Sequence, residues 1–122
     1  MNRKGFTLIE LLMVLVIIGV LASIVIPKLS RTREKAFIAT MKSDLRNLVT
    51  AEEAYFADSI KYTTDLGAAF RVSTGVGGPR IALTADGWTA TVSHKSTTKT
   101  CAVYAGSTAL APAVKEGAPH CT

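Results

Sequence analysis

An apolar stretch near the N-terminus is the strongest pattern in the sequence. From Phe6 to Ile26 only Glu10 carries a charge, and no residue from Leu11 to Ile26 does. Roughly 20 apolar residues are needed to cross a bilayer core as a helix. Neither strict alternation nor a one-sided stripe is present, so a strand and a surface helix are both disfavoured. The stretch therefore predicts a transmembrane helix.

The flanks of this stretch distinguish an anchor from a secretory signal peptide. A signal peptide has a shorter apolar region that ends at a small-residue cleavage site, whereas this run ends in Ile26-Pro27-Lys28 and continues into a charged segment. Arg3 and Lys4 hold the N-terminus on the cytoplasmic side, so we expect the rest to face the exterior or the periplasm. A carboxylate such as Glu10 inside the run costs about 3 kcal/mol and usually has a partner.

A helical pattern continues through residues 28–57. We expect Pro27 to kink the helix rather than end it, because helical propensity resumes at once. Apolar positions at spacings of three and four form a stripe that would lie along a globular head. The stripe consists of Phe37, Met41, Leu45, Leu48, Val49, Glu52, Tyr55 and Phe56.

Charged residues are expected on the outer faces of this second helical half. They are Lys28, Arg31, Arg33, Lys35, Lys42, Arg46, Glu34, Asp44, Glu52, Glu53 and Asp58. Two interpretations stay open for this mixture. It is either an ordinary solvated surface or a set of complementary rows that meet between subunits.

Residues 58–79 are predicted to form an irregular connection. A weak helical piece spans Leu66 to Phe70, and Tyr62 and Phe70 are expected to fill the core rather than to bind a ligand. The segment Thr74-Gly75-Val76-Gly77-Gly78-Pro79 is predicted to be a flexible turn. It lacks the Lys-Ser or Lys-Thr ending of a phosphate-binding loop, so we infer no nucleotide site there.

From Arg80 the period changes to two, which is typical of strands. Arg80–Ala85 and Trp88–His94 flank Asp86-Gly87, a two-residue hairpin signal because both turn residues tolerate positive φ. A polar loop at Lys95–Lys99 precedes a third strand at Thr100–Gly106. The core-facing positions are predicted to be Ile81, Leu83, Trp88, Ala90 and Val92. The pattern predicts an α+β fold in which a long N-terminal helix packs against an antiparallel sheet of three to four strands.

The segment Lys4-Gly5-Phe6-Thr7-Leu8-Ile9-Glu10, with the apolar stretch after it, resembles the N-terminus of type IV pilins and their pseudopilin relatives. The resemblance implies that a membrane peptidase cuts after Gly5 and methylates the new N-terminus, Phe6. It also implies that Glu10 neutralises the amine of a neighbouring subunit's first residue as a filament grows. Gly19 and Pro27 match the family's helix-loosening glycine and proline.

The resemblance also implies a division of the chain and a set of partners. The divisions are a cleaved leader at 1–5, a transmembrane and assembly half-helix at 6–27, an amphipathic half-helix at 28–57, a connecting loop at 58–79, and a sheet with a C-terminal tail at 80–122. The expected partners are further copies in a helical homopolymer, the prepilin peptidase and methylase, the assembly machinery of the inner membrane, and membrane lipid. We expect a single-pass inner-membrane precursor and, after assembly, a surface pilus for attachment, motility or DNA uptake.

Two cysteines lie near the C-terminus, Cys101 in the third predicted strand and Cys121 beside the last residue. Export to an oxidising compartment permits a disulfide between them, and closing a loop of about 20 residues contributes roughly 3 kcal/mol. The arrangement resembles the disulfide-bounded C-terminal region of type IV pilins. Two free thiols, or a metal pair with His120, remain the alternatives.

The sequence contains no arrangement of residues typical of an enzyme active site, and we expect neither catalysis, a cofactor nor a metal. Within the same superfamily the alternatives are a minor pilin and a type II secretion pseudopilin. The resemblance implies that pseudopilins more often hold the C-terminal region with calcium, and no Asp-rich loop occurs here. The net charge of +5 leaves weak DNA binding as an alternative of another class. Its contacts would be Arg71, Arg80, Lys95 and Lys99.

Overall fold

The computed structural model describes residues 3–122, which form a long helix and a four-stranded antiparallel sheet. The helix, α1, spans Leu8–Ser59, and a short 3-10 helix, η1, spans Gly67–Ala69. The strands are β1 (Val76–Leu83), β2 (Trp88–His94), β3 (Thr97–Ala105) and β4 (His120–Cys121), adjacent in that order. The predicted α+β class is therefore confirmed.

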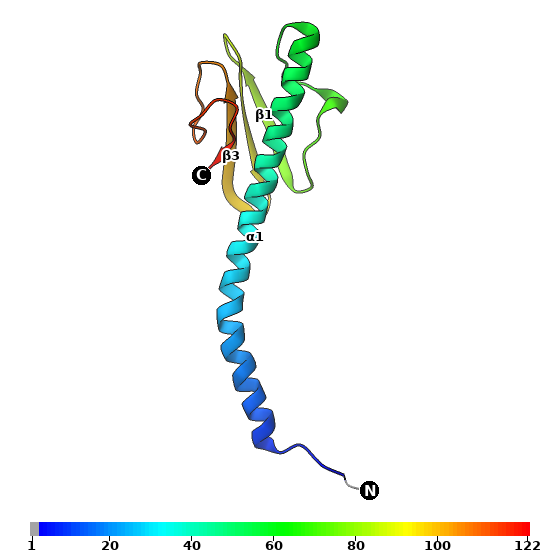
Figure 1. The fold of residues 1–122 in the computed structure, drawn as a ribbon, viewed down its shortest axis with the longest axis vertical. Helices are drawn as coiled ribbons and strands as arrows, with labels where there is room; N and C mark the ends of the chain where they lie inside the picture. The colour runs from blue at the N-terminus through cyan, green and yellow to red at the C-terminus, as the bar shows by residue number, and fades with distance from the viewer. Residues whose placement is uncertain (1–2) are drawn as a thin grey trace. The chain divides into compact units, whose positions relative to one another are not determined.

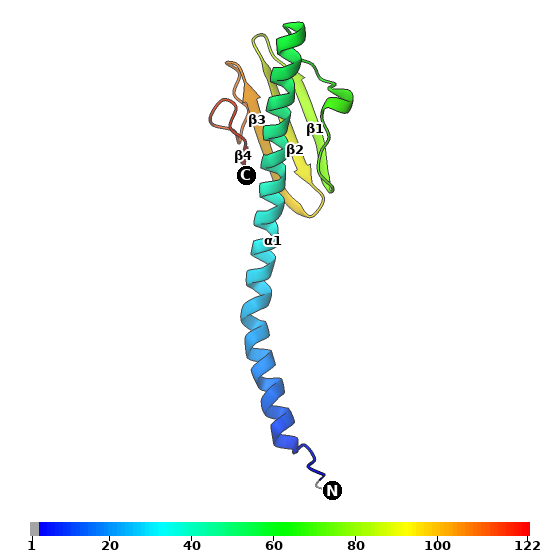
Figure 2. The same ribbon diagram turned by 45° about the vertical axis from the view of Figure 1, so that its right-hand side comes forward.

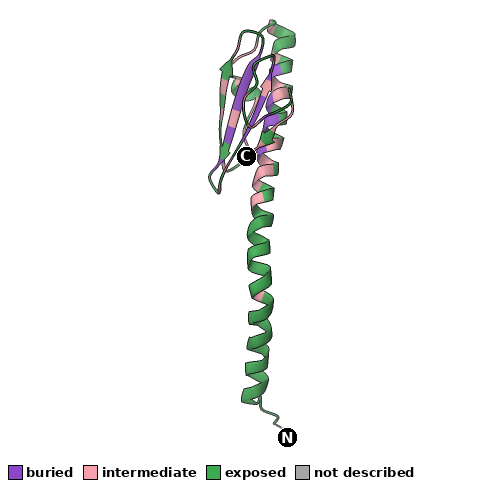
Figure 3. Cartoon of the chain, turned by 90° about the vertical axis from the view of Figure 1, so that its left-hand side faces the viewer, coloured by how far each residue is buried: buried purple, intermediate pink, exposed green. Residues whose placement is uncertain are grey.

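The chain divides into two compact units, one ending at Arg33 and the other beginning at Glu34. In the second unit the sheet covers one side of the C-terminal part of α1 (Figures 1 and 2). Three residues of the predicted stripe, Met41, Leu45 and Leu48, are fully buried against Trp88 and other strand residues. The prediction was wrong for Phe56 of the stripe and for Leu83 of the sheet, because both side chains are exposed. Every second residue of β2 from Trp88 to Val92 is buried, as expected for a sheet with one covered face, and Thr89 between them is buried as well. Figure 3 shows that the buried helical positions lie within this unit.

The start of the sheet differs from the prediction. Val76–Pro79 was assigned to a flexible turn within the connecting loop 58–79, but it belongs to β1. Gly77 pairs with Ser93 and Arg80 with Thr91, and the register shifts between these two pairs. The glycines suit this irregularity, because Gly78 has a φ of 103° and glycine alone adopts such a backbone freely.

The hairpin between β1 and β2 is offset from its prediction by one residue. The amide of Thr84 donates to the Gly87 carbonyl at 2.9 Å, so Ala85 and Asp86 form the tip of the turn. Neither Asp86 nor Gly87 has a positive φ. Gly87 is required for another reason: a Cβ there would overlap the carbonyl oxygen of Ala105. The expected polar loop at Lys95–Lys99 is also too long, because β3 already begins at Thr97.

Two carboxylates predicted on the outer faces of the helix, Asp44 and Glu52, are buried instead, although Glu52 also belongs to the predicted stripe. Asp44 accepts two hydrogen bonds from Ser73, from the amide at 2.9 Å and from the hydroxyl at 2.7 Å. Glu52 is fully buried; its Oε2 accepts from the Thr63 amide at 3.2 Å, and its Oε1 has no partner among the described residues. Asp44 and Glu52 therefore tie the connecting segment to α1. The spacing of residues along the helix does not predict these two contacts.

The C-terminal tail returns to the sheet through β4. Cys101 and Cys121 are register partners in β3 and β4 and form a disulfide, so the alternatives of free thiols or a metal pair are excluded. The amide of Thr122 donates to the Thr100 carbonyl at 3.0 Å, which extends the pairing to the last residue. The tail between the strands is thus closed into a loop at the sheet edge.

Replacement of Cys121 by serine should weaken the head and release the tail. We expect a loss of roughly 3 kcal/mol of unfolding free energy, because the disulfide no longer restricts the unfolded chain. Limited proteolysis should then cut within Ser107–His120 before any other part of the head. Thr98→Ser, at an exposed position of β3, serves as the control. An unchanged digestion pattern in Cys121→Ser would contradict the structural role of the bridge.

Glu52 should make the stability of the head depend on pH. Burial raises the pKa of its carboxyl, with a smaller contribution from Glu53, while the hydrogen bond from Thr63 opposes the rise. Because the folded-state pKa lies above that of the unfolded chain, the protonated carboxyl stabilises the fold at low pH. This contribution is lost as the pH rises through the folded pKa.

We therefore expect Glu52→Gln to raise the thermal unfolding temperature at pH 7 and to leave it nearly unchanged at pH 4. The gain at pH 7 should be about 1–3 kcal/mol, the range for a poorly satisfied buried polar group. Thermal unfolding of the full chain in detergent measures it, with Asp58→Asn at an exposed position as the control. An equal effect of Glu52→Gln at both pH values would contradict this assignment.

Candidate processing and assembly site

The predicted cleavage junction lies just before the start of α1. Gly5 and Phe6 have no regular secondary structure, and α1 begins at Leu8. The side chain of Phe6 is 89% exposed, and no atom lies within 4 Å of a Cβ built at Gly5. An irregular and exposed backbone is the kind that a peptidase can bind. The first two residues of the expected leader lie outside the described part of the chain.

The helix begins with a reciprocal cap formed by Thr7 and Glu10. The Thr7 amide and hydroxyl donate to Glu10 Oε2 at 2.9 and 2.8 Å. In return, the Glu10 amide donates to the Thr7 hydroxyl at 3.3 Å. This is the capping-box arrangement, in which the residue before the helix and the third helical residue satisfy each other's amides.

The cap gives Glu10 a partner within its own chain, whereas the resemblance implied only the amine of a neighbouring subunit. The signal was present in the sequence, because Thr-x-x-Glu before an apolar run is typical of a capping box. Only Oε2 takes part in the cap, and Oε1 accepts no hydrogen bond from the described residues. Glu10 therefore combines a local structural role with one oxygen that is free for another donor.

Among the residues that the structure describes, the large apolar side chains of the first unit are exposed. α1 is long and apolar enough to cross a membrane. The exposed large apolar residues of this unit are Phe6, Leu8, Ile9, Leu11, Leu12, Met13, Val14, Leu15, Val16, Ile17, Ile18, Val20, Leu21, Ile24, Val25, Ile26 and Leu29. So large an apolar surface is stable only against lipid or against other apolar helices.

Gly19 and Pro27 both lie inside α1. A Cβ at Gly19 would meet no atom within 4 Å, so nothing in this chain requires a glycine there. Pro27 has no amide hydrogen and leaves the carbonyl of Ser23 without its usual helical donor. The helix nevertheless continues through both positions, as expected for Pro27. Their role as a hinge stays a prediction.

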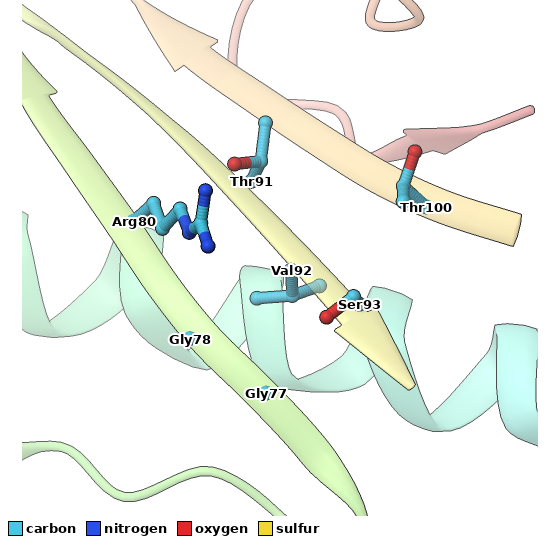
Figure 4. Close-up of a pocket in the computed structure, with 7 residues that line it drawn as sticks. All are labelled: Gly77, Gly78, Arg80, Thr91, Val92, Ser93 and Thr100. Atoms are coloured by element: carbon cyan, nitrogen blue, oxygen red, sulfur yellow. The ribbon is translucent and has the colours of Figure 1, made fainter. Parts of the chain in front are cut away.

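The four basic residues considered for DNA binding belong to different segments of the chain. Arg80 lies beside Thr91, Ser93 and Thr100 in a polar hollow of about 380 Å³ on the outer face of the sheet (Figure 4). Lys99 lies between Thr97 and Thr100, where the register of β3 against β2 shifts, and it does not line this hollow. Lys95 lies in the β2–β3 turn and Arg71 in the segment before β1. Arg80 is thus the only one of the four that lines this hollow.

Comparison with known proteins shows that the N-terminal segment matches a known motif. Residues 1–26 match the model of the prokaryotic N-terminal methylation motif. The type II secretion system core protein G of Klebsiella pneumoniae is 44% identical over 73 residues, which cover 59% of this chain and 52% of that protein. The type IV wide pilus major component of Thermus thermophilus is 42% identical over 67 residues, covering 55% and 51%.

A third relative extends the similarity further along the chain. The type IV major pilin of Myxococcus xanthus is 33% identical over 96 residues, which cover 70% of this chain and 44% of that pilin. The chain belongs to the type IV pilin and pseudopilin superfamily. It spans about half the length of the curated relatives that it matches. These relatives are components of pili and of a secretion system rather than enzymes, and the motif and the apolar helix indicate a membrane-anchored precursor.

Thr7 should hold the start of the helix in place. Thr7→Val removes the hydroxyl that serves the Glu10 amide, whereas Thr7→Ser keeps it. Loss of an N-cap side chain costs about 1 kcal/mol, which corresponds to roughly fivefold faster hydrogen exchange of the first-turn amides. Exchange measured by NMR in micelles tests this, with Thr7→Ser as the control. Equal protection in Thr7→Val and Thr7→Ser would contradict the capping role.

Proposed function

We propose that this chain is a structural subunit of a type IV pilus. The precursor is anchored in the inner membrane by residues 6–27, cut after Gly5 by the prepilin peptidase and methylated on Phe6. The inner-membrane assembly machinery then polymerises it into a surface filament for attachment, motility or DNA uptake. The observation that carries this proposal is the exposed apolar half of α1, which begins at Leu8, two residues after the exposed Phe6.

The proposed assembly step exchanges one apolar environment for another. In the membrane the apolar side chains contact lipid, and in a filament they contact the same segment of other copies. Apolar surface is buried in both states, so polar contacts decide much of the difference. The charge pair between Glu10 and the Phe6 amine of a neighbour is such a contact, and it is strongest where water is excluded.

The geometry at the start of the helix suits this pair. Cleavage after Gly5 makes Thr7 the second residue of the mature chain, so the capping box is retained. Glu10 Oε2 stays bonded to Thr7, and Oε1 is left to accept from an incoming amine. The cap thus fixes the direction of the carboxylate before assembly, which lowers the cost of ordering it during assembly.

A type II secretion pseudopilin, or a minor pilin, is the second candidate. The identity to the secretion protein of Klebsiella pneumoniae supports it as strongly as the identity to the Thermus pilin supports the first. The Cys101–Cys121 disulfide favours the pilus subunit, because the pilin resemblance includes a disulfide-bounded C-terminal region. A subunit that is abundant in sheared surface filaments is a major pilin. One that stays in the membrane fraction is a pseudopilin or minor component.

DNA uptake through direct binding is the least supported candidate, since the four basic residues belong to different segments and Arg80 alone of the four lines the hollow. Binding of this kind would fall steeply with salt and would disappear when Arg71, Arg80, Lys95 and Lys99 are neutralised.

Cleavage should depend on Gly5. Gly5→Val places a branched side chain at the proposed cut, and we expect the uncleaved precursor to accumulate. Intact mass spectrometry of the membrane fraction distinguishes the precursor from a chain that starts at Phe6. Gly19→Ala, at an open helical position, is the control and should be processed normally. Normal processing of Gly5→Val would contradict the assignment of residues 1–5 as a leader that is cut after Gly5.

Assembly should depend on the charge of Glu10 and not only on its cap. Glu10→Gln keeps an acceptor for Thr7 and removes the charge, whereas Glu10→Ala removes both. We expect both variants to be processed, to stay in the membrane and to give filament yields lower by about tenfold or more, because breaking a buried charge pair costs several kcal/mol. Sheared filament is quantified on gels. A normal yield from Glu10→Gln would show that capping alone is sufficient.

A further inference from the structure

The second unit has few exposed apolar side chains, and most of them gather at one place. Among its described residues, the large apolar side chains that are exposed are Phe56 (37%), Ile60 (80%), Leu83 (51%) and Val114 (80%). Phe56, Ile60 and Leu83 line a single hollow of about 320 Å³ between the C-terminal end of α1 and the β1–β2 turn. The remaining residue, Val114, lies in the C-terminal tail and does not line this hollow.

The walls of the hollow are held by contacts within the head. Phe56 stacks on Tyr62 with ring centroids 4.7 Å apart, and the Tyr62 hydroxyl donates to Glu53 Oε1 at 3.1 Å. On the other side, Asp86 in the β1–β2 turn accepts from the Ser107 amide at 2.9 Å. The hollow is therefore formed in the single chain and does not depend on a ligand.

Ile60 occupies this site at a conformational cost. It follows the last residue of α1 with a φ of 56°, in the left-handed region that a β-branched residue rarely adopts. Glycine usually takes this position after a helix. The side chain of Ile60 is 80% exposed, so contacts within the chain do little to offset the strain. Such an outlier at a surface points to a role outside the chain.

Val114 is a fixed projection rather than part of a loose tail. The neighbouring Ala113 is buried, and its amide donates to the Leu110 carbonyl at 2.9 Å. On the other side, Lys115 pairs with Ala118, and the Gly117 amide donates to the Tyr104 carbonyl at 2.8 Å. These contacts anchor the segment to β3 and leave Val114 exposed.

The charged residues beside Val114 can pair with the charged residues that line the hollow. Lys115 and Glu116 follow Val114, and Lys61 and Asp86 line the hollow. Hydrogen bonds hold both carboxylates: Glu116 accepts from the Gly106 amide at 2.7 Å, and Asp86 accepts from Ser107. A contact that brings Val114 to the hollow can therefore pair Lys115 with Asp86 and Glu116 with Lys61.

We propose that Val114 of one copy of this chain seats in the hollow formed by Phe56, Ile60 and Leu83 of the next copy. The inference rests on the polymerisation proposed above and assigns a head-to-head contact to it. Val114 and the hollow are formed by different residues of the head, so a contact in which each copy offers Val114 to the hollow of the next is heterologous and can repeat along a polymer.

Site-specific photo-cross-linking in the assembled polymer tests this contact. The full chain carries a benzophenone amino acid at position 114, or at the exposed position 108 of the same tail as the control. After irradiation, cross-linked dimers are isolated under reducing conditions and mapped by mass spectrometry. We expect position 114 to react with Phe56, Ile60 or Leu83 of a second chain, and position 108 to give at least fivefold less of that product. Dimers mapped elsewhere, or no dimer from an assembled polymer, would overturn the proposal.

Substitution gives an independent readout. Val114→Asp should lower polymer yield severalfold, whereas Thr108→Asp should not, and Val114→Leu should retain the wild-type yield. Both positions are exposed, so processing and membrane level should stay normal in all three variants. Wild-type polymer yield tests the proposed function by itself. A wild-type chain that does not polymerise overturns both proposals, while a full yield from Val114→Asp overturns only this contact.

Discussion

The structure depends on one requirement that the described residues do not meet: the large apolar side chains of the first helical half stay exposed. An exposed apolar surface of this extent is not stable in water, and the alternatives are lipid or further apolar helices. The first unit is therefore expected to be stable only in a membrane or in an assembly of apolar helices. The capping box of Thr7 and Glu10 starts the helix next to the predicted cleavage site and leaves one carboxylate oxygen free.

The second unit meets the opposite requirement, since it must fold around a small core. Met41, Leu45 and Leu48 pack against a sheet whose last strand contains two residues. Hydrogen bonds and a disulfide between segments that are far apart in the sequence add stability to this small core. Asp44 fixes Ser73, Glu52 fixes Thr63, and the disulfide closes the tail onto β3. A separate set of contacts, which includes Tyr62 with Glu53 and Gly117 with Tyr104, holds the hollow and the Val114 segment that are proposed to join neighbouring heads.

Patterns with many repeats were predictable from the sequence, and single contacts were not. The helix, the class of the fold and the burial of Trp88, Ala90 and Val92 follow from the spacing of apolar residues, which repeats over many positions. The hairpin was offset because Asp86-Gly87 fits a familiar turn, whereas Gly87 is needed where β3 approaches closely. The glycine-rich start of β1 was taken for a turn because composition does not reveal a strand with an irregular register. Glu52 lies in the predicted stripe, but the hydrogen bonds of Asp44 and Glu52 join partners 29 and 11 residues away, and no helical period encodes these partners.

The most direct test of the account is the intact mass of protein sheared from the cell surface. The account predicts a polymer subunit that starts at Phe6, with one additional methyl group and two hydrogens fewer for the Cys101–Cys121 disulfide. That mass would establish cleavage, methylation, oxidation and surface location in one measurement. An abundant surface polymer that retains Met1–Gly5 would contradict the processing account. A correctly processed chain that is never released by shearing would contradict the pilus and favour a pseudopilin.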